Sequence, residues 1–168
     1  MNRSSLDASV TELYDAIREA DARDGNVIIP TFALERAQEL LFFLREGMAQ
    51  GAVSENLNVF LDSPMAISAT KIFRRHPDAM KPEIEAMIRS GQDPFKLPKL
   101  SFTRDAADSM EINRLRSGAV IMAGSGMCTG GRVRHHLRHN LSRSDCSVIF
   151  VGFAAAGTLA RIIIDGAT

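Results

Sequence analysis

Residues 119–131 read AVIMAGSGMCTGG, five apolar residues that run directly into a turn rich in glycine. A short apolar run bounded by such a turn is typical of a buried β-strand. The residues after the turn, 131–141, have the spacing of a helix, so the stretch predicts a strand, a tight turn and a helix in succession. This unit decides the fold class, because the same succession recurs along the chain.

Outward from this unit, short strands alternate with longer amphipathic segments. Further strands are predicted at 26–31 (NVIIPT), 58–61 (NVFL), 100–103 (LSFT) and 147–152 (SVIFVG). Apolar residues at helical spacing predict helices at 7–22, 33–49, 64 to about 76, 84–88, 105–116 and 157–165. Short strands separated by helices predict an α/β fold of three layers, in which a mostly parallel, Rossmann-like sheet carries helices on both faces. Without a repeat or a low-complexity tract, residues 1–168 are expected to form a single domain.

The composition is that of an ordinary globular protein. The 168 residues are 45% hydrophobic and 24% charged, which allows a real core. No apolar run approaches the roughly 20 residues that a membrane-spanning helix needs, and the start, MNRSSLDASV, lacks the apolar core of a signal peptide. Cys128 and Cys146 cannot form a disulfide framework and lack zinc-finger spacing. We therefore expect a cytoplasmic protein that does not associate with membranes.

Charge is balanced overall but unevenly distributed. The net charge is zero, which by itself argues against non-specific binding of nucleic acid. Residues 1–24 hold six acidic residues against three arginines, whereas residues 112–144 hold six arginines, three histidines and no acidic residue. An anionic partner is therefore expected to approach the C-terminal half of the chain.

The residues that follow each predicted strand are the candidate site residues, because ligands of parallel sheets bind beyond the carboxyl ends of the strands. The turn from Gly124 to Gly131 (GSGMCTGG) is the most informative of these segments. Backbone N–H groups of a glycine-rich turn and the start of the next helix can bind a phosphate. The turn lacks the Lys-Ser/Thr of a P-loop and is one residue longer than the dinucleotide fingerprint. Tight packing of the helix on the sheet would explain the glycines equally well.

Two arginines lie one turn inside predicted helices. Arg36 follows the strand at 26–31, and Arg161 follows Thr158, which is placed to cap its helix. A cation near the N-terminus of a helix opposes the helix dipole. A bound anion shared with the helix start would explain both positions.

Other polar residues near the strand ends have simpler explanations. His135 and His139 could share one helix face, but no third ligand at metal-site spacing accompanies them. Asp62 and Ser63 could be a catalytic acid and hydroxyl, although Ser63 is as well placed to cap the following helix. Ser125 does not lie in a G-x-S-x-G nucleophile elbow. The residues alone assign no catalytic residue and no metal ligand.

Four stretches, in this order along the chain, resemble the β-CASP domain. They are IPTFALERAQELLFFL (29–44), FLDSPMAISATKIFRRH (60–76), AGSGMCTGGRVRHHLRHNL (123–141) and FVGFAAAGTLARIIIDGA (150–167). Together they cover residues 29–167, nearly the whole chain. The β-CASP domain occurs in RNA-processing nucleases of the metallo-β-lactamase superfamily, whose relatives include the pre-mRNA 3′-end cleavage endonuclease and bacterial and archaeal ribonucleases.

The resemblance implies a two-domain enzyme. In this family a metallo-β-lactamase domain holds two zinc ions through an H-x-H-x-D-H motif and further His and Asp ligands. The β-CASP domain is inserted into it as a cap, and RNA enters the cleft between the two domains. This chain contains no H-x-H-x-D-H, nor the Ser/Thr-Thr-Tyr and Ser-Ala-His-x-Asp segments that flank the insert. We therefore expect a β-CASP domain excised from a larger nuclease, inactive alone, with zinc held by the missing domain.

Matched residue by residue, the resemblance also implies a set of RNA-facing positions. These are Phe32, Arg36, Ser63, Ser125, Gly126, Met127, Thr158 and Arg161. The sequence departs from the family pattern at two places: Gly124 stands where serine is commoner, and Glu35 stands where glycine is common. A carboxylate beside a phosphate site disfavours Arg36 relative to Arg161.

Three functions follow as hypotheses. The first is the RNA-binding cap of a zinc-dependent ribonuclease, an endonuclease, a 5′-exonuclease or both, that hydrolyses phosphodiester bonds and holds single-stranded RNA by salt-sensitive backbone contacts. The second is a stand-alone nucleotide-binding module that uses the turn from Gly124 to Gly131. Asp145 speaks against it, because it precedes the next predicted strand instead of ending it. The third is a scaffolding domain whose strand-end face packs on a partner.

Overall fold

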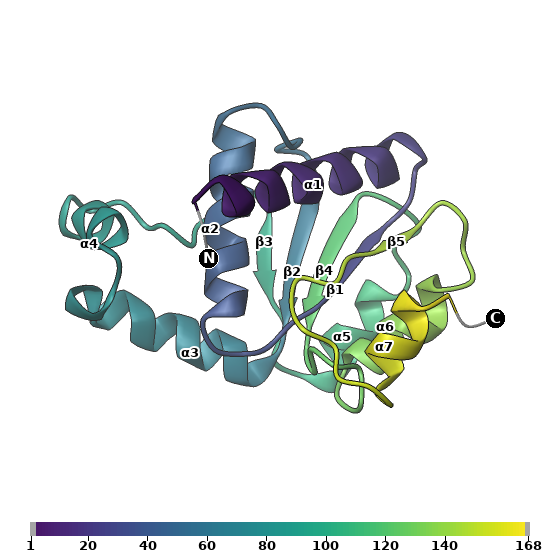
Figure 1. Cartoon of the computed structure of the whole chain (residues 1–168). Helices are drawn as coiled ribbons and strands as arrows, with labels where there is room; N and C mark the ends of the chain where they lie inside the picture. Colours follow the sequence, from purple (N-terminus) through teal and green to yellow (C-terminus); the bar gives the residue numbers. More distant parts are fainter. Residues whose placement is uncertain (1–2, 167–168) are drawn as a thin grey trace.

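A single parallel sheet forms the centre of the molecule (Figure 1). The computed structural model describes residues 3–166, with the side chains of residues 5–166. The five strands are β1 Val27–Pro30, β2 Asn58–Asp62, β3 Leu100–Phe102, β4 Ala119–Ala123 and β5 Ser147–Val148. They lie in the order β3–β2–β4–β1–β5, and every neighbouring pair is parallel. The predicted α/β class and the predicted parallel sheet are confirmed.

Helices connect the strands. Their bounds in the described residues are α1 Arg3–Ala22, α2 Arg36–Ala49, α3 Pro64–Arg75, η1 (a 3₁₀ helix) Pro77–Ala79, α4 Pro82–Arg89, α5 Ala106–Ile112, α6 Val133–Asn140 and α7 Leu159–Ile164. The start of α3 follows directly from the sequence, because Ser63 accepts a hydrogen bond from the N–H of Ala66 and Pro64 fits the first turn. The start predicted for α2 is wrong. Glu35 has a φ of 61°, so the helix begins only at Arg36, and Leu34 lies exposed in the preceding turn.

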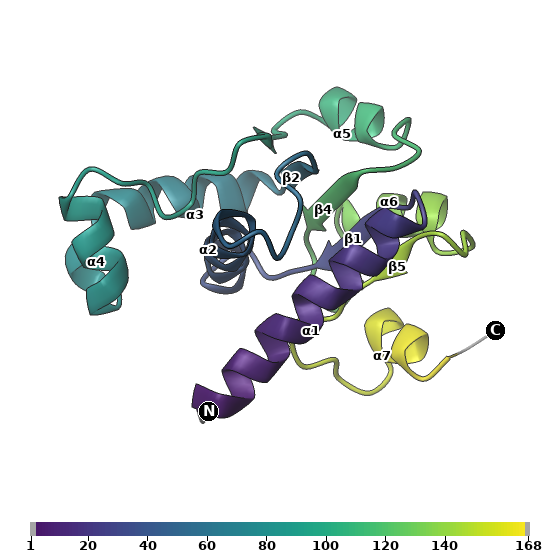
Figure 2. The ribbon, with the colours of Figure 1, turned by 90° about the horizontal axis from the view of Figure 1, so that it is seen from above.

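Alternate residues of the strands bury opposite faces of the sheet. On one face, Val27, Ile29 and Met122 pack with the apolar sides of α1 and α2. On the other face, Ile28 packs with α6 and α7, and Ile121 packs with α5. Figure 2, which views the molecule from above, shows α1 and α2 on one side of the strands and α5 and α6 on the other. The central strands β1 and β4 are buried along their whole length, which explains their unbroken apolar sequences.

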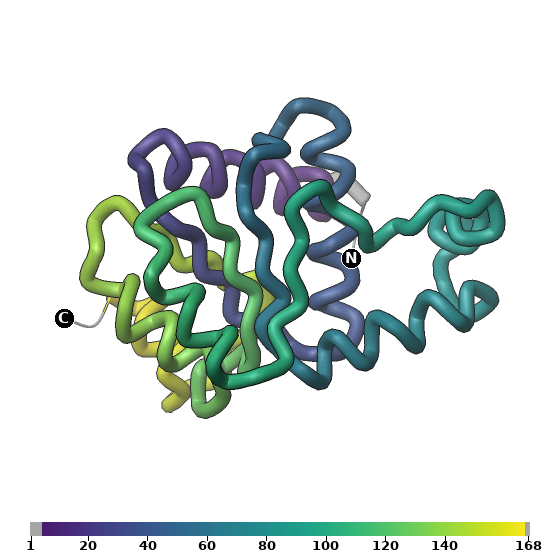
Figure 3. The backbone as a smooth tube through the Cα atoms, turned by 180° about the vertical axis from the view of Figure 1, so that it is seen from behind, coloured from purple at the N-terminus to yellow at the C-terminus, as the bar shows by residue number. Residues whose placement is uncertain are grey.

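One segment of the chain projects from this layered body. The outer part of α3, η1 and α4 extend away from the sheet, as Figures 2 and 3 show from two directions. No residue of α4 is fully buried, although Ile84 of this helix touches the edge of the core. The three elements form an arm that is attached to the body at the first turns of α3 and by the loop into β3.

Two elements are shorter in the structure than the sequence predicts. The last strand is predicted at 147–152 but pairs only at Ser147–Val148, because the chain after Ile149 leaves the edge of the sheet. Helix α5 ends at Ile112, earlier than the predicted Arg116, and Met110 on it is exposed. Within the described residues, no helix has the length and apolar character that crossing a membrane requires.

Candidate nucleic-acid interface at the carboxyl edge of the sheet

The connections of the two central strands leave the sheet in opposite directions. From β1 the chain crosses through α2 to β2, and from the neighbouring β4 it crosses through α6 to β5 on the other side. A crevice between loops is expected where such connections diverge, beyond the carboxyl ends of the strands. The predicted site residues come from the segments that meet here: 31–36 after β1, Ser63 after β2, 124–131 after β4 and 149–161 after β5.

Phe32 and Gly126 pack against each other at this edge. A Cβ atom placed on Gly126 would lie 2.7 Å from the ring of Phe32, so the ring rests directly on the glycine backbone. The residue at 126 must therefore lack a side chain for this contact to form. The phenyl ring is 45% exposed, which leaves part of its surface open to solvent. Two residues predicted from different segments are thus brought together.

The glycine-rich turn closes on itself through backbone hydrogen bonds. The N–H of Val133 donates to the carbonyl of Gly124 at 3.0 Å, and the N–H of Ser125 donates to the carbonyl of Gly130 at 3.1 Å. The hydroxyl of Ser125 accepts from the N–H of Gly130 at 3.3 Å, so it serves the turn itself. The N–H groups of Gly126 and Met127 donate to no acceptor within residues 5–166. Met127 is partly exposed, so its N–H can face an anion, whereas Gly126 is buried beneath Phe32.

Ser63 and Thr158 act as helix caps. Ser63 Oγ accepts from the N–H of Ala66 at 3.3 Å, and Thr158 Oγ1 accepts from the N–H of Arg161 at 3.3 Å. The capping role that the sequence allows for both residues is confirmed. Each hydroxyl retains acceptor and donor capacity beyond the cap, and Thr158 uses its proton on the carbonyl of Ala155 at 2.7 Å.

The two predicted anion-binding arginines already have carboxylate partners. Arg36 forms an ion pair with Glu39 on the next turn of α2. Arg161 pairs with Asp165 on α7, with its Nε 2.9 Å from Asp165 Oδ1. Both pairs are intrahelical and partly exposed, so each offsets the unfavourable placement of the arginine near a helix start. The structure thus supplies an explanation for these positions that needs no bound anion.

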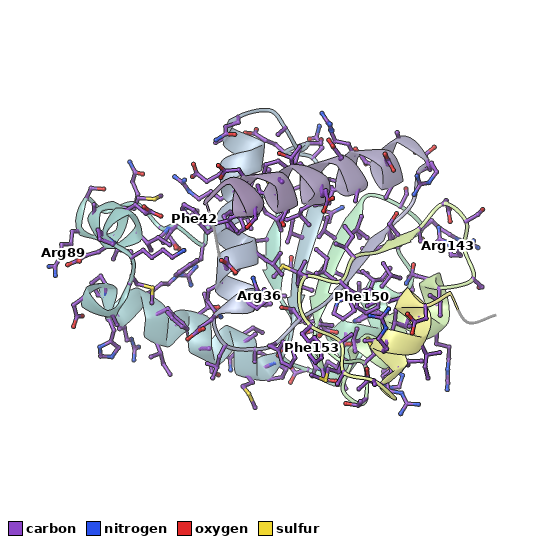
Figure 4. The ribbon with its side chains drawn as sticks, in the orientation of Figure 1. Arg36, Phe42, Arg89, Arg143, Phe150 and Phe153 are labelled. Atoms are coloured by element: carbon purple, nitrogen blue, oxygen red, sulfur yellow. The ribbon has the colours of Figure 1, made fainter. Side chains whose placement is uncertain are left out.

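Exposed apolar side chains accompany Phe32 on the strand-end segments. Phe153, in the segment after β5, is 78% exposed, and Met65, in the first turn of α3, is 68% exposed. Figure 4 shows Phe153 and Arg36 toward the same edge of the molecule, well away from Arg89 on the arm. An aromatic ring with an open face is what unstacked nucleobases bind.

Behind this edge lies a buried polar cluster built around Asp62, the last residue of β2. Asp62 Oδ2 accepts a hydrogen bond from Ser109 Oγ at 2.6 Å and lies 2.6 Å from His136 Nε2. Its Oδ1 accepts from Arg132 Nη1 at 2.7 Å. The side chains of Asp62 and His136 are fully buried, and the other ring nitrogen of His136 lies 2.9 Å from Asn113 Oδ1. The cluster ties α5, α6 and the turn before α6 to the end of β2.

The surroundings of Asp62 keep its carboxylate ionised. Burial by itself would raise the pKa of Asp62, but hydrogen bonds from His136, Ser109 and Arg132 outweigh it and lower the pKa from 3.8 to about 2. A carboxylate that is charged near neutral pH, enclosed and fully hydrogen-bonded has no proton to give a substrate. The structure therefore assigns Asp62 to holding the strand ends in place and not to acid catalysis.

His136 and Arg132 were not singled out from the sequence, although a signal for His136 exists. His136 and Asn140 stand at i+3 and i+7 from the buried Val133, on the stripe where α6 packs on the sheet. A polar residue on such a stripe needs a buried partner. The histidines that the sequence did single out, His135 and His139, lie exposed on the opposite side of α6. Within the described residues, no three His, Cys, Asp or Glu side chains gather closely enough to hold a metal ion.

Comparisons with known proteins bear on the whole chain. The model of the Beta-Casp domain family matches residues 37–163. Ribonuclease TTHA0252 of Thermus thermophilus is 35% identical over 156 residues, which are 93% of this chain and 36% of that protein. Transcription termination factor FttA of Methanocaldococcus jannaschii is 35% identical over 156 residues (92% of this chain, 24% of that protein), and FttA of Methanococcus maripaludis is 32% identical over 161 residues (95% and 25%).

The chain therefore spans about a quarter to a third of the length of these relatives. The matched region begins at Ala37 in α2 and ends at Ile163 in α7, so it contains four of the five strands and the glycine-rich turn of the candidate interface. With the family model and the relatives in agreement, the chain belongs to the Beta-Casp domain family.

Proposed function

We propose that this domain binds single-stranded RNA at the carboxyl edge of its sheet and acts as the cap of a zinc-dependent ribonuclease. The observation that carries the proposal is the open face of Phe32, which rests on Gly126 beside the unused N–H group of Met127. An aromatic platform next to a backbone donor offers one surface for a base and another for its phosphate. The Thermus thermophilus relative is named a ribonuclease, which supports the proposal.

The residues divide into two kinds of contact. The turn would present the N–H of Met127 and the hydroxyl of Ser125 to a phosphate beside Gly126, while Phe32 would stack against a base. Ser63 would offer its remaining hydroxyl capacity at the start of α3, where the helix dipole favours an anion. Arg36 and Arg161 would reach the RNA backbone by exchanging their present carboxylate partners for phosphate. Thr158 would lie beside the phosphate that Arg161 binds.

Hydrolysis belongs, in this proposal, to a companion metallo-β-lactamase domain of the same full-length protein, in the cytoplasm. The described residues do not fit a zinc site, so the two zinc ions and the water they activate would be held there. This domain would hold and orient the strand at the cleft between the two. The isolated chain is accordingly expected to bind RNA weakly and to leave it uncut.

The test is a fluorescence anisotropy titration of oligouridine into the 168-residue chain at low ionic strength. Phe32→Ala should weaken binding by about 5- to 100-fold, because stacking of a base on an aromatic ring contributes roughly 1–3 kcal/mol. Ile72→Ala is the matched control, since Ile72 is a similarly exposed apolar residue on the outer part of α3.

Equal affinities for Phe32→Ala and Ile72→Ala would overturn the proposed platform. Tight, saturable binding of a mononucleotide in calorimetry, with no gain from a longer strand, would instead favour the stand-alone nucleotide-binding module. Cleavage of the RNA by the chain alone with added zinc would contradict the assignment of hydrolysis to a companion domain.

A further inference from the structure

A groove separates α6 from α7 on the side of the molecule next to β5. Its volume is about 990 Å³, at the upper end of the range of small-molecule pockets. The floor is aliphatic, formed mainly by Leu137 of α6 and by Leu159 and Ile163 of α7. The rim on α6 carries two arginines, Arg134 and Arg138, with His135 beside them. The groove takes no part in the contacts of Phe32 or of the Asp62 cluster.

The cations of the rim have no carboxylate to neutralise them. Arg134 and Arg138 form no ion pair within residues 5–166. Most arginines of the described chain do form one, including Arg161 on the facing helix, so the rim is unusual in this molecule. Uncompensated positive charge beside an apolar floor attracts a partner that is anionic and apolar at once.

The groove begins at the glycine-rich turn that also contributes to the proposed RNA site. Gly130 and Gly131, which end the glycine-rich turn, also line the groove. Arg134 and Arg138 follow one helical turn apart, about 6 Å along the axis. A strand whose phosphate binds the turn would therefore meet these two cations in succession as it leaves the carboxyl edge.

We propose that the groove between α6 and α7 is a second RNA subsite, which holds the backbone of the strand beyond the carboxyl edge. This inference rests on the proposed function and extends it. Single-stranded RNA presents phosphates on one side and flat, apolar base faces on the other, which matches a cationic rim and an aliphatic floor. Arg134 and Arg138 bind consecutive phosphates, while bases or riboses cover Leu137, Leu159 and Ile163. The contacts carry no base specificity, because cations recognise the phosphate alone.

The experiment compares two labelled oligouridines, of about 4 and about 12 nucleotides, in anisotropy titrations across a series of salt concentrations. The double variant Arg134→Gln, Arg138→Gln removes both charges and keeps good helix formers in α6. Its matched control is Lys71→Gln, Arg75→Gln. These residues are also exposed, four apart on a helix and without an ion pair among the described residues, but they lie on the arm.

For the longer RNA, the groove variant should lower the magnitude of the slope of log affinity against log salt by about 1.4, since each phosphate contact on a single strand contributes about 0.7. Its affinity for the shorter RNA, which the strand-end site covers, should stay that of the wild type. The arm variant should match the wild type for both RNAs. These three results together support the subsite.

A groove variant that is indistinguishable from the arm variant would overturn the inference while leaving the strand-end site standing. No binding of either RNA by the wild type would overturn both proposals. Polyglutamate of equal charge serves as a competitor for the longer RNA. If it displaces this RNA from the wild type but not from the groove variant, the groove is assigned to an acidic peptide and RNA is rejected as its occupant.

Discussion

At the scale of single residues, Asp62 connects more elements than any other polar side chain at the strand ends. It ends β2, and its two oxygens receive donors from α5, from α6 and from the turn before α6. Arg132 extends the Asp62 cluster to β3, because it donates to the carbonyl of Thr103, just after that strand, at 3.0 Å. The candidate RNA edge is therefore positioned by a buried charge whose partners satisfy it on every side.

Asp62→Asn should lower the free energy of unfolding by about 3–5 kcal/mol, because removing one member of a buried ion pair leaves its partners unpaired. Asp93→Asn is the control. It breaks the half-exposed pair between Arg74 and Asp93 and should cost at most about 1 kcal/mol. Urea unfolding of both variants at neutral pH measures the difference, and similar midpoints would show that the cluster does not stabilise the fold.

The variant Asp62→Asn also tests how the stability of the protein depends on pH. The pKa of Asp62 is lowered from 3.8 to about 2 in the folded protein, so its contribution to stability is complete above pH about 4 and is lost as the pH falls through about 2. Wild-type protein should therefore lose more stability across this window than Asp62→Asn does. Urea midpoints at each pH measure this loss. An equal loss of stability in the two proteins would assign the acid sensitivity to other carboxylates.

At the scale of elements, two helices that start beyond strand ends differ in how they are capped. The hydroxyl of Ser63 accepts from a backbone N–H in the first turn of α3, whereas Asp105 precedes α5 without any side-chain cap bond. Both residue types are favoured at this position, so their sequences do not distinguish them.

Ser63→Ala should destabilise the protein by about 1 kcal/mol, the usual contribution of a side-chain cap. Asp105→Ala should leave stability within about 0.5 kcal/mol of the wild type, because no cap bond is lost. Thermal unfolding followed by circular dichroism compares the two. An equal loss for both substitutions would mean that the cap bond of Ser63 contributes little.

At the scale of the whole molecule, stability is unevenly divided between the layered body and the arm. The body buries β1 and β4 on both faces, whereas α4 buries no residue fully. Local opening is governed by how much apolar contact must be broken. The arm can therefore open while the sheet and the candidate RNA edge stay formed.

Amide hydrogen exchange should reveal this division. Amides of α4 are expected to exchange at least about 100-fold faster than those of β4, since their opening exposes little apolar surface. Peptide-level mass spectrometry of the native chain resolves the two segments. Exchange of both at one common rate would indicate a single cooperative unit that includes the arm.

Much of the fold was predictable because its signals are local. The central strands β1 and β4 are apolar runs that record burial on both faces, and the caps at Ser63 and Thr158 follow from residue type and position. The ion pairs of Arg36 and Arg161 also had a local signal, because their partners stand three and four residues away on the same helix. The exposed start of α2 had none, since the positive φ of Glu35 reflects how the chain enters the helix.

The sequence by itself determined the α/β class, the positions of the strands and the family, because periodicity, turn residues and ordered motifs are written along the chain. Tertiary structure alone decided the strand order, the partner of Asp62 74 residues away on α6, and which arginines remain without a carboxylate. These pairings join segments that are distant in sequence, so they contribute free energy only after those segments have packed together. The contact of Phe32 with Gly126, and the groove beside α6, belong to this second kind.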